Sequence, residues 1–209
     1  MIFKRCSTAM TCPAGKGLII WGALWTAPSS ERTTRERKID ANTFLIWQGG
    51  DVADFEFTAK VRFKENNSGV QCRSQFIDEP NFALMGYQMD LHPSAKFFGM
   101  LYGEKYERRG KIMTRGRKVE IDTNAAVKQT DNVGSNEELT DWKWNDIRII
   151  AVGDRLIHQV GGVTTIDVTD QRLRPALIMA SCSENRMVDN NSGQSDKMHC
   201  LSQSIRKMP

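Results

Sequence analysis

Two short runs, NSGVQCRSQF at 67–76 and GYQMDLH at 86–92, alternate polar and apolar residues at period two, which is typical of extended strands. Residues two apart in a strand share a face. The polar faces would carry Gln71, Arg73 and Gln75 in the first run and Gln88, Asp90 and His92 in the second. The opposite faces would carry Val70, Cys72, Phe76, Tyr87, Met89 and Leu91. The polar sets supply donors, acceptors and a titratable base, so the two runs predict a groove for a polar ligand.

Short strand-like segments separated by turn residues continue from Asn42 to about Met179, and none of them has the periodicity of a long amphipathic helix. The sequence therefore predicts an all-β fold. The expected strands are Thr43–Gln48, Phe55–Lys64, Gly69–Phe76, Gly86–Leu91, Gly99–Tyr102, Lys118–Asp122, Trp144–Val152, Arg155–Val160 and Val163–Val168.

Two glycine-containing dipeptides separate the last three of these segments. Gly153-Asp154 and Gly161-Gly162 fit tight hairpin turns that need positive φ angles. We therefore expect three consecutive antiparallel strands. The segment 131–141 is rich in Asn, Gly, Ser and acids, and we interpret it as a surface loop or one weak helical turn.

Length and charge exclude several kinds of protein. A chain of 209 residues suits one domain of ordinary size. Its net charge of +4 is spread among acids, without a basic stripe interleaved with aromatics, so there is no nucleic-acid signal. The five cysteines are odd in number and irregularly spaced, so they predict neither a disulfide framework nor a zinc site.

The two ends of the chain lack the alternation of the centre. Residues 1–40 have no clear period, but an apolar run at 18–25 behind Lys4 and Arg5 loosely resembles a secretory signal. That run is too short to span a bilayer as a helix. We therefore divide the chain into a leader at 1–40, a sandwich domain at 41–180 and a polar tail at 181–209, and expect an extracytoplasmic location.

Several blocks in the centre of the chain are similar to one known family. They are NTFLIWQGGDVADFEFTAKVRF (42–63), NSGVQCRS (67–74), GYQMDL (86–91), GMLYGE (99–104), RGRKV (115–119), WNDIRIIAVGDRLIHQVGG (144–162) and IDVTD (166–170). In order and spacing they resemble the 3-keto-disaccharide hydrolase domain family, long catalogued as domain of unknown function 1080. The resemblance covers roughly 42–175, whereas the opening and closing strands typical of the family do not appear at either end.

This resemblance implies a concanavalin-like jelly-roll β-sandwich and cleavage of glycosides whose sugar is oxidised to a ketone at C3. The ketone acidifies the proton on C2, so loss of the aglycone from C1 needs a base near C2 and a donor that polarises the C3 oxygen. Asp90 is the expected base, and Arg73 would neutralise the developing oxyanion. Glu104 is a second carboxylate, either for acid/base work or for a bound divalent cation. The alternatives are a surface ion pair for Asp90, a cross-strand pair of Arg73 with Asp90, and a solvated loop charge for Glu104.

Other residues are candidates for holding the sugar. Gln71 and Gln88 suit hydroxyl recognition, although polar strand residues need no ligand. Tyr102 would face the same way as Glu104, and Trp47 could stack on a sugar ring or belong to the core. His92 precedes Pro93 and could instead be an incidental surface residue. His158 is expected to be a core or edge histidine.

Several chemistries have no signature in the sequence. There is no glycine-rich phosphate loop, His-Glu-x-x-His pair, nucleophile elbow or CxxC pair. The sequence predicts no particular cofactor. The expected function is cleavage of 3-keto-glycosides, by hydrolysis or by elimination and hydration. The alternatives are a non-catalytic carbohydrate-binding module, because one fold serves many functions, and an inactive remnant with lost terminal strands.

Overall fold

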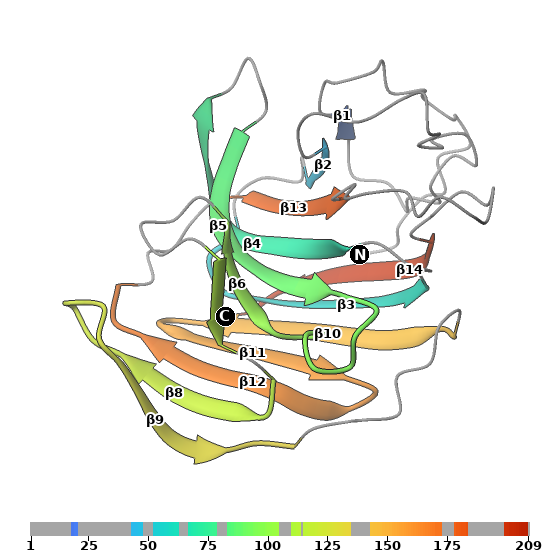
Figure 1. Cartoon of the computed structure of the whole chain (residues 1–209). Coiled ribbons are helices and arrows are strands. Elements are labelled where there is room, and N and C mark those ends of the chain that lie inside the picture. Colours follow the sequence, from blue (N-terminus) through green and yellow to red (C-terminus); the bar gives the residue numbers. More distant parts are fainter. Residues whose placement is uncertain are drawn as a thin grey trace, which may run out of the picture.

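The computed structural model describes residues 18–20, 43–47, 52–62, 67–78, 83–104, 110–113, 115–134, 143–172, 178–183 and 199–208. All regular secondary structure in these residues is β-strand. The strands form two sheets that lie on each other as a sandwich (Figure 1). The predicted all-β sandwich is therefore confirmed.

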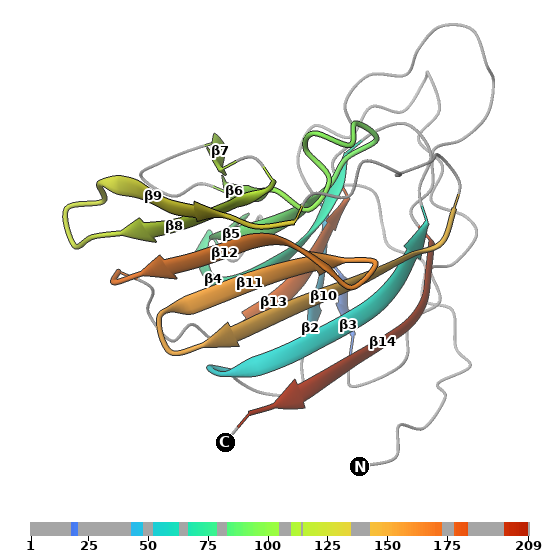
Figure 2. The same cartoon turned by 90° about the horizontal axis from the view of Figure 1, so that it is seen from below.

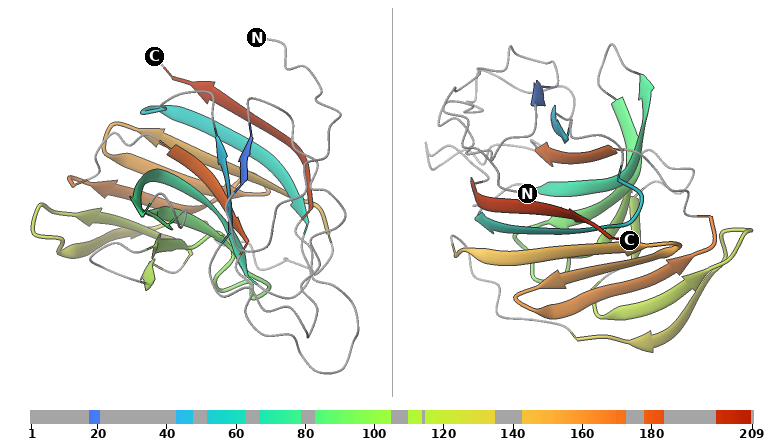
Figure 3. Two further views of the ribbon diagram at one scale, coloured as in Figure 1. Left: turned by 90° about the horizontal axis from the view of Figure 1, so that it is seen from above. Right: turned by 180° about the vertical axis from the view of Figure 1, so that it is seen from behind.

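The first sheet, called sheet A, carries the two runs that alternate at period two. In spatial order it contains β1 (Leu18–Ile20), β2 (Thr43–Trp47), β13 (Ile178–Ser183), β4 (Ser68–Asp78), β5 (Ala83–Leu91), β6 (Leu101–Glu104) and β7 (Gly110–Met113). The β1–β2 pair is parallel and the other pairs are antiparallel. Seen from behind, β13 lies beside β4 (Figure 3).

The second sheet, called sheet B, is seen face-on from below in Figure 2. In spatial order it contains β14 (His199–Lys207), β3 (Phe55–Arg62), β10 (Asn145–Val152), β11 (Arg155–Val160), β12 (Val163–Asp170), β8 (Arg117–Ile121) and β9 (Val127–Asn132). The β12–β8 pair is parallel and the others are antiparallel. The three consecutive strands β10, β11 and β12 are confirmed.

The glycine turns between these three strands have the geometry that the sequence predicts. Gly153 has a φ of 56°, Gly161 of 57° and Gly162 of 80°, values at which glycine avoids the clash of a Cβ atom. The hairpins fix the register of the strands. Alternate residues of β10 and β11 consequently point inward, in the burial pattern of a sheet with one covered face.

The hydrophobic core fills the space between the two sheets. Sheet A contributes Val70, Cys72, Tyr87, Met89, Leu91, Leu101 and Met113, and sheet B contributes mainly Phe55, Phe57, Ile147, Ile149, Leu156, Ile166 and Val168. Each of these residues is almost fully buried, and each apolar side chain of this size stabilises the fold by about 1.5–3 kcal/mol through transfer from water. Every other position of β4 and β5 is therefore left to face away from the core.

The strands near the two ends extend beyond the expected domain boundaries. β13 completes sheet A between β2 and β4, where the sequence suggested that a closing strand was missing. β14 lies in the segment expected to be a polar tail, but it pairs with β3 along nearly its whole length. The expected strand set also lacked β1, β7 and β9, and β9 occupies part of the segment interpreted as a loop.

Candidate functional site

The paired register of β4, β5 and β6 places several polar residues on the outer face of sheet A. Gln71 is opposite Gln88, which is opposite Tyr102. Asp90 and Gly86 lie two residues on either side of Gln88 along β5. Asp90 is opposite Gly69 of β4, and Gly86 is opposite Glu104 of β6. Residues that pair directly share a face, so all these side chains lie on the side away from the core. This surface, called the site face, carries Gln71, Ser74, Gln88, Asp90, Tyr102 and Glu104.

A missing side chain at Gly69 gives Gln88 the room to reach Asp90. A Cβ atom at Gly69 would lie 2.5 Å from both Cγ and Cδ of Gln88, which is too close for any real contact. The Gln88 side chain lies across this space and donates from Nε2 to Oδ1 of Asp90 at 2.7 Å. The Asp90 carboxylate is thereby held in one orientation on the site face.

The site face is buried, which makes its polar atoms costly unless they are paired. Gln71 and Gln88 are 0% exposed, Asp90 is 1% exposed and Glu104 is 9% exposed. Neither amide atom of Gln71, nor Oε1 of Gln88, has a hydrogen-bond partner among the described residues. Each such buried atom costs about 1–3 kcal/mol, and a ligand hydroxyl or a water molecule could satisfy it.

Arg73 and Gln75 do not lie on the site face, so their predicted placement is wrong. The ladder between β4 and β5 shifts register after Cys72 and resumes at Gln75, which pairs with Met85 on the core side of β5. Phe76 pairs with Leu84 and so takes the site side, opposite to the prediction. A β-bulge adds one residue to a strand and reverses the facing of everything beyond it.

Arg73 itself stands in the bulge, with a positive φ of 52°. Its guanidinium Nη2 lies 3.3 Å from Oδ1 of Asp54, at the entrance to β3 in the opposite sheet. The same Asp54 oxygen accepts a hydrogen bond of 2.9 Å from the backbone of Gly153. Arg73 therefore connects sheet A to sheet B, and it is not placed to neutralise an oxyanion on the site face.

Ser74 occupies the site face in place of Arg73, and sequence reasoning missed it. A Cβ atom at Gly86 would lie 2.3 Å from the Ser74 Oγ, which places the hydroxyl on the same face as Gly86 and Gln88. Ser74 is 0% exposed, and its Oγ has no hydrogen-bond partner among the described residues. No glycine marks the bulge in the sequence, so period two alone could not reveal it.

Two further site candidates are not joined to the others by the described contacts. His92 follows β5, and its Nδ1 accepts a hydrogen bond of 2.9 Å from the backbone of Ser94 while its ring contacts Phe97 edge-on. His92 therefore helps to form the turn after β5. Trp47 ends β2, where its backbone pairs with Ile20, and its side chain lies outside the part of the structure that is described.

The buried His158 of sheet B supports the turn that leads out of β5. Its Nδ1 lies 3.2 Å from the carbonyl oxygen of Gly99, and Gly99 donates its backbone N–H to the carbonyl of Asp90 at 2.7 Å. Burial lowers the pKa of His158 to about 4, against the opposing effect of the Gly99 and Met100 backbone. His158 is therefore neutral at physiological pH and acts as a core histidine, as predicted.

Among the described residues, no group of three or more His, Cys, Asp and Glu side chains could hold a metal ion. Cys72 lies in the core, and burial raises the pKa of its thiol to about 12. It is therefore a protonated apolar residue rather than a thiolate nucleophile or ligand.

The two carboxylates of the site face are far apart. Asp90 is four residues from Gly86 along β5, and Glu104 pairs with Gly86 on the next strand. With about 3.4 Å per residue along a strand and about 4.8 Å between strands, their Cα atoms are roughly 14 Å apart. Side chains that stand perpendicular to a sheet keep this separation. The two carboxylates of a conventional glycosidase flank one bond at about 5–9.5 Å, so Asp90 and Glu104 do not form such a pair.

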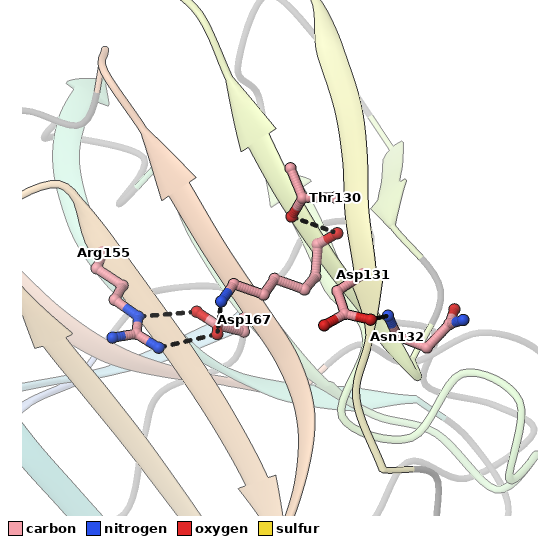
Figure 4. Close-up of polar contacts among 6 residues, drawn as sticks. Thr130, Asp131, Asn132, Arg155 and Asp167 are labelled. Carbon is pink, nitrogen blue, oxygen red and sulfur yellow. Dashed lines mark hydrogen bonds and ion pairs between the residues drawn. The ribbon is translucent and has the colours of Figure 1, made fainter.

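A second polar cluster lies on the outer face of sheet B and has the features of an ordinary surface network. Figure 4 shows Arg155 donating two hydrogen bonds of 2.9 Å to Asp167. Lys118 lies 3.7 Å from the same carboxylate, and its backbone carbonyl accepts a bond from Thr130. Arg155 and Lys118 are about half exposed and already paired, so this cluster is not the candidate site.

The protein is therefore an all-β sandwich that carries a buried polar patch on the outer face of one sheet. The sequence profile of the 3-keto-alpha-glucoside-1,2-lyase-like domain matches residues 15–187. The chain belongs to this family, which confirms the resemblance noted in its sequence and makes it a carbohydrate-related protein. The match extends on both sides of the stretch at 42–175.

Solved structures share the fold at low sequence identity. The carbohydrate-binding module CBM66 from Bacillus subtilis superposes with a TM-score of 0.50 at 12% identity, over 90% of this chain and 99% of that one. A candidate glycosyl hydrolase from Parabacteroides distasonis ATCC 8503 has a TM-score of 0.49 at 13% identity, over 81% of this chain and 85% of that one. No curated protein matches the chain. The described residues contain no helix long and apolar enough to cross a membrane.

Proposed function

We propose that this protein cleaves 3-keto-glycosides by elimination across C1 and C2, with Asp90 as the base. The observation that carries this proposal is the buried Asp90 carboxylate, held on the site face by the amide of Gln88. Asp90 takes the proton from C2, and the electrons of that C–H bond form an enolate on the C3 oxygen. The enolate then expels the aglycone oxygen from C1 and leaves a C1–C2 double bond. Water adds at C1 while a proton returns to C2, so the net reaction is hydrolysis.

The wide separation of Asp90 and Glu104 supports elimination over direct displacement. Direct glycoside hydrolysis uses two carboxylates on either side of one bond. A 3-keto sugar needs only one base for its first step, because the ketone supplies the electron sink. Glu104 remains a candidate for protonating the departing oxygen of a long aglycone or for binding a distant hydroxyl, since it lies at the more exposed end of the site face.

Amide and hydroxyl groups of the site face, rather than Arg73, stabilise the developing oxyanion and bind the sugar. Gln71 is buried, and both atoms of its amide are without a partner in the described chain, so Nε2 can donate to the C3 oxygen. Oε1 of Gln88 and the phenol of Tyr102 lie in the same cross-strand row and suit sugar hydroxyls. Tyr102 is half-buried, which makes the β6 side the natural entrance.

The test is incubation of the purified protein with 3-keto-sucrose, 3-keto-trehalose and a 3-keto-β-glucoside, with and without a chelator. Running the reaction in deuterium oxide distinguishes the two chemistries. Elimination followed by hydration places one solvent deuterium on C2 of the product. Direct hydrolysis leaves C2 unlabelled and would count against Asp90 as a C2 base. Loss of turnover with chelator would show that a divalent cation takes part.

The second candidate function is a non-catalytic carbohydrate-binding module, because the fold is shared with such a module. Binding of intact glycans without turnover of any 3-keto-glycoside would establish it. A cooperative thermal transition distinguishes either function from an inactive remnant. An extracytoplasmic location is also a proposal, motivated by the signal-like run near the N-terminus, and cell fractionation tests it.

A further inference from the structure

The bulge in β4 exchanges one residue of the site face for another. Without it, period two would carry Gln71, Arg73 and Gln75 on that face. With it, the ladder breaks between Cys72 and Gln75, and Ser74 is the residue that follows Gln71 on the site side. Bulges next to binding sites commonly aim one side chain at the ligand.

The arginine in the bulge contacts Asp54 next to the opposite sheet. Arg73 adopts a left-handed backbone conformation that is unfavourable for a residue with a Cβ atom, so the surrounding structure must stabilise it. Its side chain is 1% exposed, and Nη2 lies 3.3 Å from Oδ1 of Asp54. Asp54 is itself fixed by the Gly153 backbone in the hairpin between β10 and β11. The pair with Asp54 therefore links the strained residue to the opposite sheet.

Ser74 directs its hydroxyl over Gly86 on the site face. Its neighbour across the ladder is Gly86, which has no side chain, and Glu104 follows on the far side of Gly86. Ser74 is completely buried, and its Oγ has no hydrogen-bond partner within the described ranges. A buried hydroxyl in this state is expected to pair with a ligand group or with an ordered water molecule.

We propose that Ser74 binds a hydroxyl of the sugar and that the Arg73–Asp54 pair positions it there. Ser74 is then a substrate-binding residue between Gln71 and Glu104, and Arg73 is a positioning residue that touches no substrate. This inference rests on the proposed function for the identity of the ligand. It adds a specificity determinant, because one hydroxyl can report the configuration of one carbon of the sugar.

The first experiment compares Ser74→Ala with the unmodified protein on the best 3-keto-glycoside. Loss of one neutral hydrogen bond should raise KM about 3- to 10-fold, while kcat stays within about twofold. The melting temperature should stay equal or rise, because the variant no longer buries an unpaired hydroxyl. Thr164→Ala is the matched control. Thr164 accepts a hydrogen bond from Gln159 on sheet B, and removal of this hydroxyl should leave KM unchanged.

Deoxygenated substrates identify the group that Ser74 binds. With the unmodified protein, one monodeoxy analogue should have a kcat/KM about 3- to 10-fold lower than that of the full substrate. With Ser74→Ala, the same analogue and the full substrate should have equal kcat/KM values. Asp54→Asn should also raise KM. The double variant Asp54→Asn/Ser74→Ala should have the same KM as Ser74→Ala alone. An unchanged KM in Ser74→Ala, or equal losses for every analogue in both proteins, overturns the proposal.

Failure of the proposed function gives a different result from failure of this inference. If the unmodified protein turns over no 3-keto-glycoside, the same variants are compared by calorimetry for binding of intact glucosides. A weaker Kd for Ser74→Ala, with Thr164→Ala unchanged, still supports Ser74 as a ligand contact. An unchanged Kd overturns it.

Discussion

Gln88 lies over Gly69 on the outer face of sheet A, and its amide donates to Oδ1 of Asp90 over 2.7 Å. The contact depends on a residue that has no side chain. Gly69 therefore provides the space in which Gln88 reaches Asp90. The first prediction tests this dependence.

In Gly69→Ala, the new methyl group should displace Gln88 from Asp90, because it would stand 2.5 Å from Cγ and Cδ of Gln88. Overpacking of this kind typically destabilises a protein by about 1–3 kcal/mol. We expect a lower free energy of unfolding in urea and a lower kcat on the 3-keto-glycoside. The double variant Gly69→Ala/Gln88→Ala removes the clash and should regain the stability but not the kcat. A kcat equal to that of the unmodified protein in both variants would contradict the positioning role of Gln88.

Asp90→Asn should abolish turnover and leave the fold intact. The amide matches the carboxylate in shape but cannot accept the proton from C2, and loss of a general base typically slows a reaction about 10²- to 10⁴-fold. Steady-state rates and a far-UV circular dichroism spectrum measure the two effects. Asp131→Asn, at an exposed position of β9, is the control and should retain full activity. Near-full activity of Asp90→Asn would make Glu104 the next candidate.

The buried His158 should make the protein less stable in acid. Its pKa is lowered to about 4 in the folded state, whereas an unfolded histidine has a pKa of about 6.5. Between about pH 6.5 and pH 4, His158 is protonated in the unfolded chain but neutral in the folded protein, so protonation favours unfolding. The stability is therefore complete above about pH 6.5 and is lost as the pH falls toward 4, by up to about 3 kcal/mol.

The measurement is the free energy of unfolding in urea between pH 4 and pH 7. Carboxylates also titrate in this range, so the result is the difference between the unmodified protein and His158→Asn. The variant should be less stable at pH 7 but show a shallower loss in acid. Parallel pH profiles of the two proteins would disagree with the assignment.

The surface pair of Arg155 and Asp167 should contribute little to stability. Asp167 raises the pKa of Arg155 through a hydrogen bond and through its charge, but the arginine side chain is 50% exposed. Exposed pairs of this kind are worth about 0.2–1 kcal/mol and are screened by salt. Arg155→Gln should therefore lower the melting temperature slightly in low salt and less in molar salt, with unchanged turnover. A loss that is independent of salt would show that packing, rather than charge, is responsible.

The sequence was most informative where local chemistry decides the structure. The glycines at 153, 161 and 162 determine the hairpins of β10, β11 and β12, because few other residues adopt those φ angles. The alternation of β5 placed Gln88 and Asp90 on one face, and the alternation of β6 placed Tyr102 and Glu104 on one face. Only the pairing of the two strands in the structure shows that these two faces are the same.

The positions that were not predicted depend on distant contacts. The bulge at Arg73 has no local signal, since its conformation is stabilised by Asp54 on another sheet. β13 and β14 have weak alternation, and their pairing with β4 and β3 decides their structure. Cys182, for example, lies in β13 opposite Gly69, although it belongs to the segment expected to be a tail.

The pairing of β3 with β14 has a consequence for the newly made chain. β3 ends at Arg62 and β14 begins at His199, so at about 5–20 residues per second the ribosome needs roughly 10 s to supply the partner. During this interval one edge of β3, with its apolar phenylalanines, has no neighbour and can pair with strands of other nascent chains. Expression yield should consequently depend on chaperone supply more than the stability of the finished sandwich would suggest.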